Sequence, residues 1–243
     1  MQYLKSYSDE RDMGTKGLVE DYCAYCGGPR ETFDHVPPKF FLDDPLPENL
    51  HKIGACLSCN NGASPHEQYV ACLIDAVLAG STSERAKLRP KVAAIFECRP
   101  ALAEQLERLR QEGESGPVWA PDMQRAQLVG AKLARGHAAF ELSLPLVGNP
   151  DRVFVIPLMS LPNSERQAFE TYPATNMWPE VGSRAIQRMV VGGGADVEDG
   201  WVIVQQGRYR YMAVFDGDVL VRVVLSEYLG IEVSWASGQD DWW

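Results

Sequence analysis

The apolar positions of the C-terminal third predict a β-rich region. Five segments, from "DRVFVIPL" to "IEVSWA", are rich in β-branched and aromatic residues, and turn sequences such as Gln206-Gly207 and Asp216-Gly217 punctuate them. Strands joined by such short turns run antiparallel. The sequence therefore predicts a C-terminal antiparallel β-sheet, and a helix in "WPEVGSRAIQRMVV" that leads into it.

The middle of the chain carries apolar residues at helical spacing. Ser64, with Pro65 beside it and Glu67 three residues on, has the capping-box pattern of a helix start, and Gly80 is placed to end that helix. Prolines interrupt the helical pattern of residues 83–111, which predicts two or three short helices there.

Residues 22–62 differ from the regions that follow them. They are dense in Cys, Pro, Gly, Asn and Asp, a composition that favours hairpins and loops over long helices. Such a segment has little apolar core of its own and needs a cross-link or a metal to hold it together. Further along, a helix is predicted over residues 121–135, with Gly136 as its stop.

Four cysteines stand in two C-x-x-C pairs. Cys23 and Cys26 form the first pair, Cys56 and Cys59 the second, and 29 residues separate them. Each pair can turn two thiolates to one side, so the two pairs together suit one tetrahedral Zn²⁺. Such a closed site has no open position for catalysis, and we expect it to be structural. The single cysteines at positions 72 and 98 are expected to be buried thiols.

The composition and charge of the chain limit the classes of protein to which it can belong. The chain has 243 residues and a formal net charge of -10, which argues against a protein that coats nucleic acid through a broad positive field. A local binding site stays open, because a bound metal adds positive charge of its own. No apolar run approaches the roughly 18 residues of a membrane span, and the N-terminal segment is polar, so we expect a cytoplasmic protein without membrane contact.

The motifs around the cysteines carry a family resemblance. The segments "CAYCGGPRETFDHVPPK", "PENL" and "ACLSCNNGAS" resemble the HNH endonucleases, whose ββα-metal site is often held by four cysteines. The resemblance covers about residues 20–80. It implies a zinc-stapled ββα-metal HNH module in residues 1–80. Residues 81–243, with the helical segment and the C-terminal antiparallel β-sheet predicted above, are expected to form an accessory region for DNA, dimer or partner contacts, so the expected fold class is α+β.

The residue types inside this frame suit phosphodiester hydrolysis. His35 can be neutral at cellular pH and take a proton from water, which makes it the candidate general base. Asp34 and Asn60 offer oxygen ligands for a catalytic Mg²⁺ or Mn²⁺. The resemblance further implies that Asn49 fixes the loop that carries His35 through hydrogen bonds.

Two neighbouring residues have more than one reading. Many family members have histidine where this chain has Asn60, and His66 could supply the missing nitrogen, although an exposed surface histidine is the plainer interpretation. Glu67 is read first as a helix-capping residue and second as a carboxylate near the metal. His51 and His137 are expected to be structural.

The charge distribution along the chain does not indicate where DNA would bind. Residues 1–80 hold six lysine and arginine residues against twelve carboxylates, so the module itself is acidic. Residues 83–110 hold seven against four and form the densest basic segment. Phosphate contact and an ordinary solvated helix face are both open readings of that segment.

Two functions of different classes compete. The first is a metal-dependent HNH endonuclease that cuts DNA; by analogy with small HNH proteins it would act in antiphage defence, as a homodimer or beside a partner defence subunit. The alternative is a non-catalytic zinc-stapled module that binds nucleic acid or protein. The joint presence of Asp34, His35, Asn49 and Asn60 favours the enzyme, and the acidic composition favours the binder.

Overall fold

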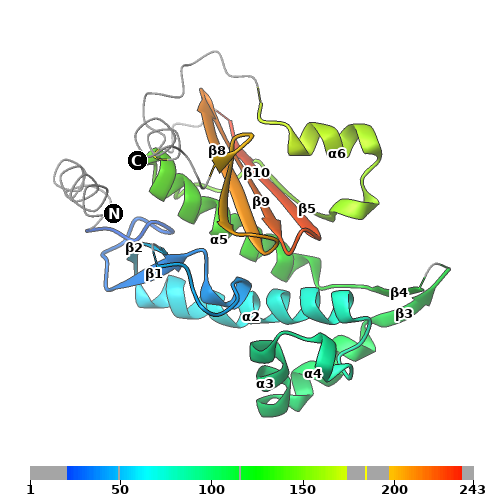
Figure 1. Cartoon of the computed structure of the whole chain (residues 1–243). Helices are drawn as coiled ribbons and strands as arrows, with labels where there is room; N and C mark the ends of the chain where they lie inside the picture. The colour runs from blue at the N-terminus through cyan, green and yellow to red at the C-terminus, as the bar shows by residue number, and fades with distance from the viewer. Residues whose placement is uncertain (1–20, 49, 115, 174–183, 185–196, 237–243) are drawn as a thin grey trace.

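The chain is a mixed α+β protein in which helices and a large sheet share one core (Figure 1). The computed structural model describes residues 21–48, 50–114, 116–173, 184 and 197–236. No helix among these residues is long and apolar enough to cross a membrane.

The cysteine-rich segment folds into a hairpin followed by a long helix. Strands β1 (Thr32–Val36) and β2 (His51–Ala55) pair antiparallel, with His35 opposite Lys52, and α2 (Leu57–Ala79) follows directly. The order of this segment is therefore strand, strand, helix.

Helix α2 begins seven residues before the predicted start at Ser64, so that prediction was wrong. Its N-cap is Cys56, whose sulfur accepts a hydrogen bond from the backbone N–H of Cys59. Pro65 therefore lies inside the helix, where a proline costs about 3 kcal/mol in an isolated helix. The buried face of α2, which includes Tyr69 and Ile74, has to outweigh that cost.

Short helices follow α2, as the prolines predicted. Helices α3 (Pro90–Cys98) and α4 (Pro100–Arg108) each have a proline at the first helical position, where its missing N–H has no partner to lose. Strands β3 (Arg110–Gly113) and β4 (Gly116–Trp119) then form a hairpin that was not predicted, because its polar residues lack the alternation of a half-buried strand.

Helix α5 (Met123–Leu142) runs past the predicted stop at Gly136. A Cβ atom at Gly136 would lie 3.1 Å from Cγ2 of Val36 on β1. The glycine therefore allows the hairpin to approach the helix closely and does not end the helix. The start is set by Asp122, whose carboxylate accepts a hydrogen bond from the backbone N–H of Arg125.

The predicted C-terminal sheet is confirmed. Its six strands are antiparallel in the order β5-β10-β9-β8-β7-β6, and helix α6 (Asn163–Glu170) packs its Phe169 beside Trp201 on the sheet. The helix predicted for residues 178–191 lies outside the described residues apart from Arg184. The strand bounds are β5 (Arg152–Pro157), β6 (Val197–Glu198), β7 (Trp201–Gln205), β8 (Tyr209–Asp216), β9 (Asp218–Leu225) and β10 (Leu229–Trp235).

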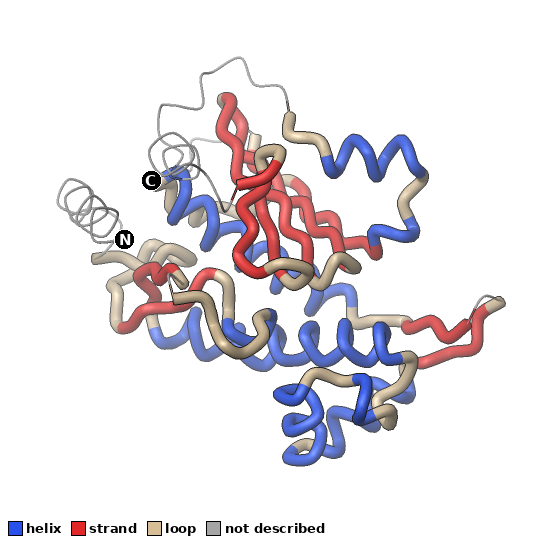
Figure 2. The backbone as a smooth tube through the Cα atoms, in the orientation of Figure 1, coloured by secondary structure: helices blue, strands red, loops and turns tan. Residues whose placement is uncertain are grey.

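Helix α5 lies between α2 and the sheet, as Figures 1 and 2 show. The main apolar core joins Ile74 of α2, Leu133 of α5 and Val221 of β9, so it runs across the expected boundary after residue 80. The division into residues 1–80 and 81–243 stays a prediction, and the first part does not bury its apolar face alone.

The tight packing of α5 gives a stability prediction. A Cβ atom at Gly130 would lie 2.9 Å from Cγ2 of Ile231 in the sheet, whereas Gly62 in α2 has no atom within 4 Å of that position. Alanine raises helix propensity by about 1 kcal/mol at either glycine, so the difference between the two variants isolates the clash. We expect Gly130→Ala to be less stable than Gly62→Ala by about 1–3 kcal/mol in urea denaturation of zinc-loaded protein. Equal stabilities would show that α5 and the sheet are not this close.

Candidate functional site

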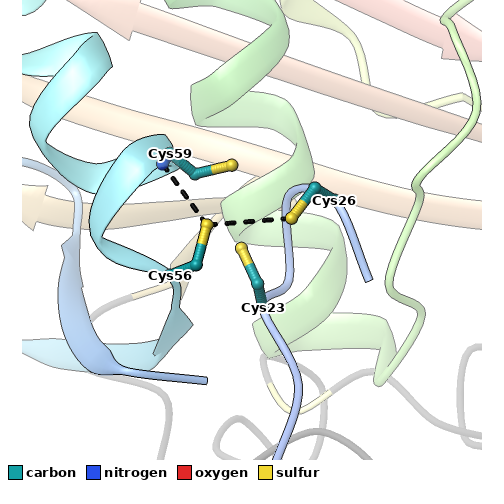
Figure 3. A group of neighbouring side chains, drawn as sticks. All are labelled: Cys23, Cys26, Cys56 and Cys59. Carbon is teal, nitrogen blue, oxygen red and sulfur yellow. Dashed lines mark hydrogen bonds between the residues drawn. The ribbon is translucent and has the colours of Figure 1, made fainter. Parts of the chain in front are cut away.

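The four cysteines of the two predicted pairs come together at one point. Cys23 and Cys26 lie in the loop before β1, and Cys56 and Cys59 lie at the start of α2, so their sulfurs point toward one another from two elements (Figure 3). All four sulfurs lie within 4.8 Å of one another, and those of Cys26 and Cys56 are 3.8 Å apart. Sulfurs bound tetrahedrally to zinc at about 2.3 Å have nearly this separation. The cluster therefore fits a metal ion such as zinc.

The loop before β1 is shaped to present its two thiols. The backbone N–H of Cys23 donates to the carbonyl of Gly28, and the N–H of Gly27 donates back to the carbonyl of Cys23. Gly27 has φ of 72°, a conformation that favours glycine. Local hydrogen bonds and a glycine therefore fix the turn, so that both thiols of this C-x-x-C pair can point toward the cluster.

The thiols of the cluster ionise unequally. The Ser58 hydroxyl, 3.1 Å from the Cys56 sulfur, and the N–H of Cys59 lower the pKa of Cys56 to about 6. Burial raises the pKa of Cys26 and of Cys59. Four thiolates in this space therefore need a bound cation to compensate them.

The two single cysteines differ from each other. Cys72 is buried in α2, and burial raises its pKa to about 12, as expected of an inert thiol. Cys98 at the end of α3 is exposed, which corrects the expectation that it is buried.

Asp34 lies on the buried face of β1, against α5. Its Oδ2 atom accepts a hydrogen bond from the Tyr25 hydroxyl at 2.9 Å and lies 2.6 Å from the Lys132 ammonium. Lys132 comes from α5, about a hundred residues further along the chain. The carboxylate expected to hold a metal therefore already has a cationic partner.

Glu67 completes this buried cluster. Its Oε1 atom is 2.5 Å from the same Lys132 ammonium, and the residue is 3% exposed. Burial raises the pKa of Glu67 although Lys132 acts in the opposite direction. The first reading of Glu67, as a helix-capping residue, was wrong, because α2 begins ten residues earlier. Its second reading, as a carboxylate near the metal, stays a prediction; Glu67 and Asp34 share the Lys132 ammonium.

A directly bound Mg²⁺ or Mn²⁺ does not fit the Oδ2 atom of Asp34 in this arrangement. Its Oδ2 atom already has two donors, and an ion at about 2.1 Å would compete with the ammonium for that oxygen. Across the described ranges, the cysteine cluster is the only group of three or more His, Cys, Asp or Glu side chains placed to share an ion.

His35 projects from the other face of β1, because neighbouring side chains on a strand alternate. Burial lowers the pKa of His35, and the positive charges of Lys39 and Lys52 lower it further, while Asp34 opposes them. The imidazole is therefore neutral near pH 7. His35 also borders a hollow that Tyr25 and Lys132 line and that is too small to hold a water molecule.

The outer face of the hairpin is cationic and aromatic. Phe33, two residues before His35, is 45% exposed, and the Arg30 guanidinium lies 4.5 Å from its ring centroid. Lys52 is exposed directly across the hairpin from His35, and Lys39 is exposed in the turn that follows β1. We call the face formed by Arg30, Phe33, His35, Lys39 and Lys52 the hairpin outer face.

The remaining candidate residues are Asn60, Asn49 and His66. Asn60 is half-buried in the first turn of α2, where its backbone carbonyl accepts from the Ser64 hydroxyl. Asn49 lies outside the described residues. His66 is half-buried, and its Nδ1 atom has no hydrogen-bond partner within the described ranges.

The other two histidines pack against aromatic rings. The ring of His51 stacks on Phe140. His137 is buried within α5 and bonds to the Tyr209 hydroxyl. Both positions suit structural roles, although His137 lies in a helix interior and not at the helix end that was expected.

Part of the basic segment of residues 83–110 makes contacts within the protein. Arg89 is buried and pairs with Asp75 at 2.7 Å, and Lys91 bonds to the backbone carbonyl of Leu42. Lys87 is exposed and lies 3.6 Å from Glu84. The structure therefore removes Arg89 from the residues that could contact phosphate.

Sequence reasoning did not identify Lys132. One signal was available: in "QLVGAKLARGHAAF" a lysine interrupts a run of small and apolar residues on a predicted helix. A charge in such a position is rarely buried without a partner. The pattern could have indicated a buried ion pair but not its partners.

The cysteine cluster predicts metal content. Zinc-loaded protein is expected to carry about one Zn²⁺ per chain by elemental analysis. Cys56→Ser should lose the ion and unfold the hairpin, because the cluster ties the loop before β1 to α2, and Cys72→Ser should keep it. Full zinc content in Cys56→Ser would contradict the site.

No family model, no curated protein sequence and no solved structure matches this chain. The resemblance to the HNH endonucleases therefore rests on the residues quoted for it in the sequence.

Proposed function

We propose that the chain is an HNH-type endonuclease, a hydrolase that cleaves DNA phosphodiester bonds. The observation that carries the proposal is the hairpin outer face, where a neutral imidazole stands beside two exposed lysines. In a chain with a net charge of -10, such a local group of cations is a specific feature.

The residues of this face suit the steps of hydrolysis. The His35 imidazole can accept the proton of an attacking water. Lys39 and Lys52 can neutralise charge on the phosphoryl oxygens. Phe33 with Arg30 offers a flat surface on which a base can stack. Zinc at the four cysteines would hold the hairpin against α2, with no part in the reaction.

The catalytic Mg²⁺ or Mn²⁺, with Asp34 and Asn60 as ligands and Asn49 as a loop anchor, belongs to the proposal through the resemblance alone. Because Lys132 is bonded to Asp34, the support for cleavage comes from His35 as proton acceptor and from the cations beside it. A role in antiphage defence, beside a second copy or a partner defence subunit, is likewise proposed by analogy.

One observation favours the second candidate, a non-catalytic zinc-stapled binding module. Asp34 is buried and neutralised by Lys132, as in a structural ion pair. In that case the hairpin outer face would bind nucleic acid without cutting it. Cleavage assays separate the two functions.

His35→Ala tests the enzyme. Removal of the proton acceptor should lower plasmid cleavage in the presence of Mn²⁺ by at least about 100-fold while DNA binding persists. The variant and the wild type are compared at equal zinc content and equal thermal midpoint, so that a folding defect is not read as a catalytic one. Wild-type cleavage rates in His35→Ala, with contaminating nucleases excluded, would show that the enzyme proposal is wrong.

Lys52→Glu tests the binding face, with Lys87→Glu as a control of equal charge change. Lys52→Glu should weaken DNA binding measured by fluorescence anisotropy and reduce the slope of log affinity against log salt by about one. Lys87→Glu, on the basic segment beside Glu84, should leave both unchanged. An equal loss in the two variants would assign the effect to overall charge and not to the hairpin outer face.

A further inference from the structure

We propose that Lys132 is a tethered cation that occupies the place of a metal ion at Asp34 and keeps the candidate catalytic centre closed to metal until the lysine withdraws. This inference rests on the proposed function and concerns its regulation. It follows from the disagreement between the metal that the resemblance implies and the contacts that Asp34 makes.

The Lys132 ammonium is shared between two carboxylates. Its nitrogen lies 2.6 Å from Oδ2 of Asp34 and 2.5 Å from Oε1 of Glu67. The three residues come from β1, α2 and α5, which are distant in sequence and meet only in the folded chain. The Lys132 ammonium thus bridges two carboxylates, as a divalent ion would.

Burial makes this cation necessary. Asp34, Glu67 and Lys132 are 7%, 3% and 7% exposed. Two carboxylates removed from water need a compensating charge, because an unpaired buried ion is strongly destabilising. Lys132 supplies one positive charge between them, and a metal ion could take its place only after the ammonium had moved.

Tyr25 reinforces the closed state. Its hydroxyl donates to the same Oδ2 atom of Asp34, and the Lys132 ammonium lies 5.1 Å from the centroid of its ring. Ammonium and ring attract each other in such an arrangement. Tyr25 also stands between Cys23 and Cys26, so the metal cluster positions one wall of the Lys132 site.

The substrate offers a reason for the lysine to leave. Lys132 and His35 border the same hollow, which is too small to hold a water molecule, so a phosphodiester bound beside His35 would lie outside it and act on the ammonium through its negative charge. The anion would compete with the two carboxylates for Lys132. Withdrawal of the lysine toward the phosphate would expose Asp34 and Glu67 to a divalent ion when nucleic acid is present.

Metal binding without nucleic acid tests the inference. Zinc-loaded full-length wild type, Asp34→Asn, Lys132→Gln and the double variant Asp34→Asn/Lys132→Gln are titrated with Mn²⁺, followed by electron paramagnetic resonance. Wild type and Asp34→Asn should give the same weak binding. Lys132→Gln should bind Mn²⁺ at least about tenfold more tightly, since it leaves two carboxylates without a cation, and the double variant should lose this gain.

Two outcomes would overturn the inference. One is wild-type binding of Mn²⁺ that is as tight as in Lys132→Gln and is lost in Asp34→Asn. The other is a folded Lys132→Gln that gains no Mn²⁺ site, because Lys132 would then not be what excludes the ion.

Lysine labelling covers the case in which Lys132→Gln does not fold. Wild-type protein is treated with an amine-acetylating reagent, and the modification of Lys132 is compared with that of exposed Lys52 by mass spectrometry. Lys132 should be at least about tenfold slower to react, and Mn²⁺ together with single-stranded DNA should accelerate it. Labelling of Lys132 as fast as Lys52, or no acceleration with DNA and Mn²⁺, would contradict a lysine that closes the site and withdraws.

The failure of this inference is distinct from failure of the proposed function. If Lys132→Gln gains an Asp34-dependent Mn²⁺ site but no variant cuts DNA, Lys132 excludes the ion and the enzyme proposal fails. If wild type cuts DNA with a His35-dependent rate and binds Mn²⁺ at Asp34 as tightly as Lys132→Gln does, the enzyme stands and the inference fails.

Discussion

Helix α5 is enclosed by the hairpin, α2 and the sheet, and a helix in that position has to meet two physical demands. Where another element comes close, it needs residues without bulk: Gly136 faces Val36 of β1 and Gly130 faces Ile231 of β10. Where it buries a polar group, it needs a partner for that group. Lys132 is bonded to Asp34 and Glu67 for this reason.

The same demand accounts for further polar groups along α5. His137 bonds to the Tyr209 hydroxyl at 2.7 Å, and Glu141 accepts a hydrogen bond from the Tyr211 hydroxyl. Both tyrosines belong to β8 of the sheet. A row of polar contacts thus runs along α5, from the hairpin at Lys132 to the sheet at Glu141. These contacts fix the rotation of α5 more sharply than apolar contacts alone, because a small rotation would leave a buried group without its partner.

Features governed by local chemistry could be predicted from the sequence. The two C-x-x-C pairs indicated the cysteine cluster, Pro90 and Pro100 indicated the short helices, and the β-branched segments indicated the sheet. Features governed by contacts between distant residues could not be predicted. The start of α2 depends on a cysteine cap, the continuation of α5 depends on the approach of Val36, and the environment of Asp34 depends on a lysine almost a hundred residues away.

The position of Lys132 also bears on how such a protein can evolve by exchange of parts. The hairpin and α2 carry both carboxylates, but the cation that compensates them is supplied by residues after position 80. An accessory region taken from elsewhere would have to bring a cation to the same point, or the recipient would have to lose Asp34 or Glu67. Residues 1–80 alone therefore lack the ammonium that lies between Asp34 and Glu67, and any recombination that joins them to a new partner has to restore that positive charge.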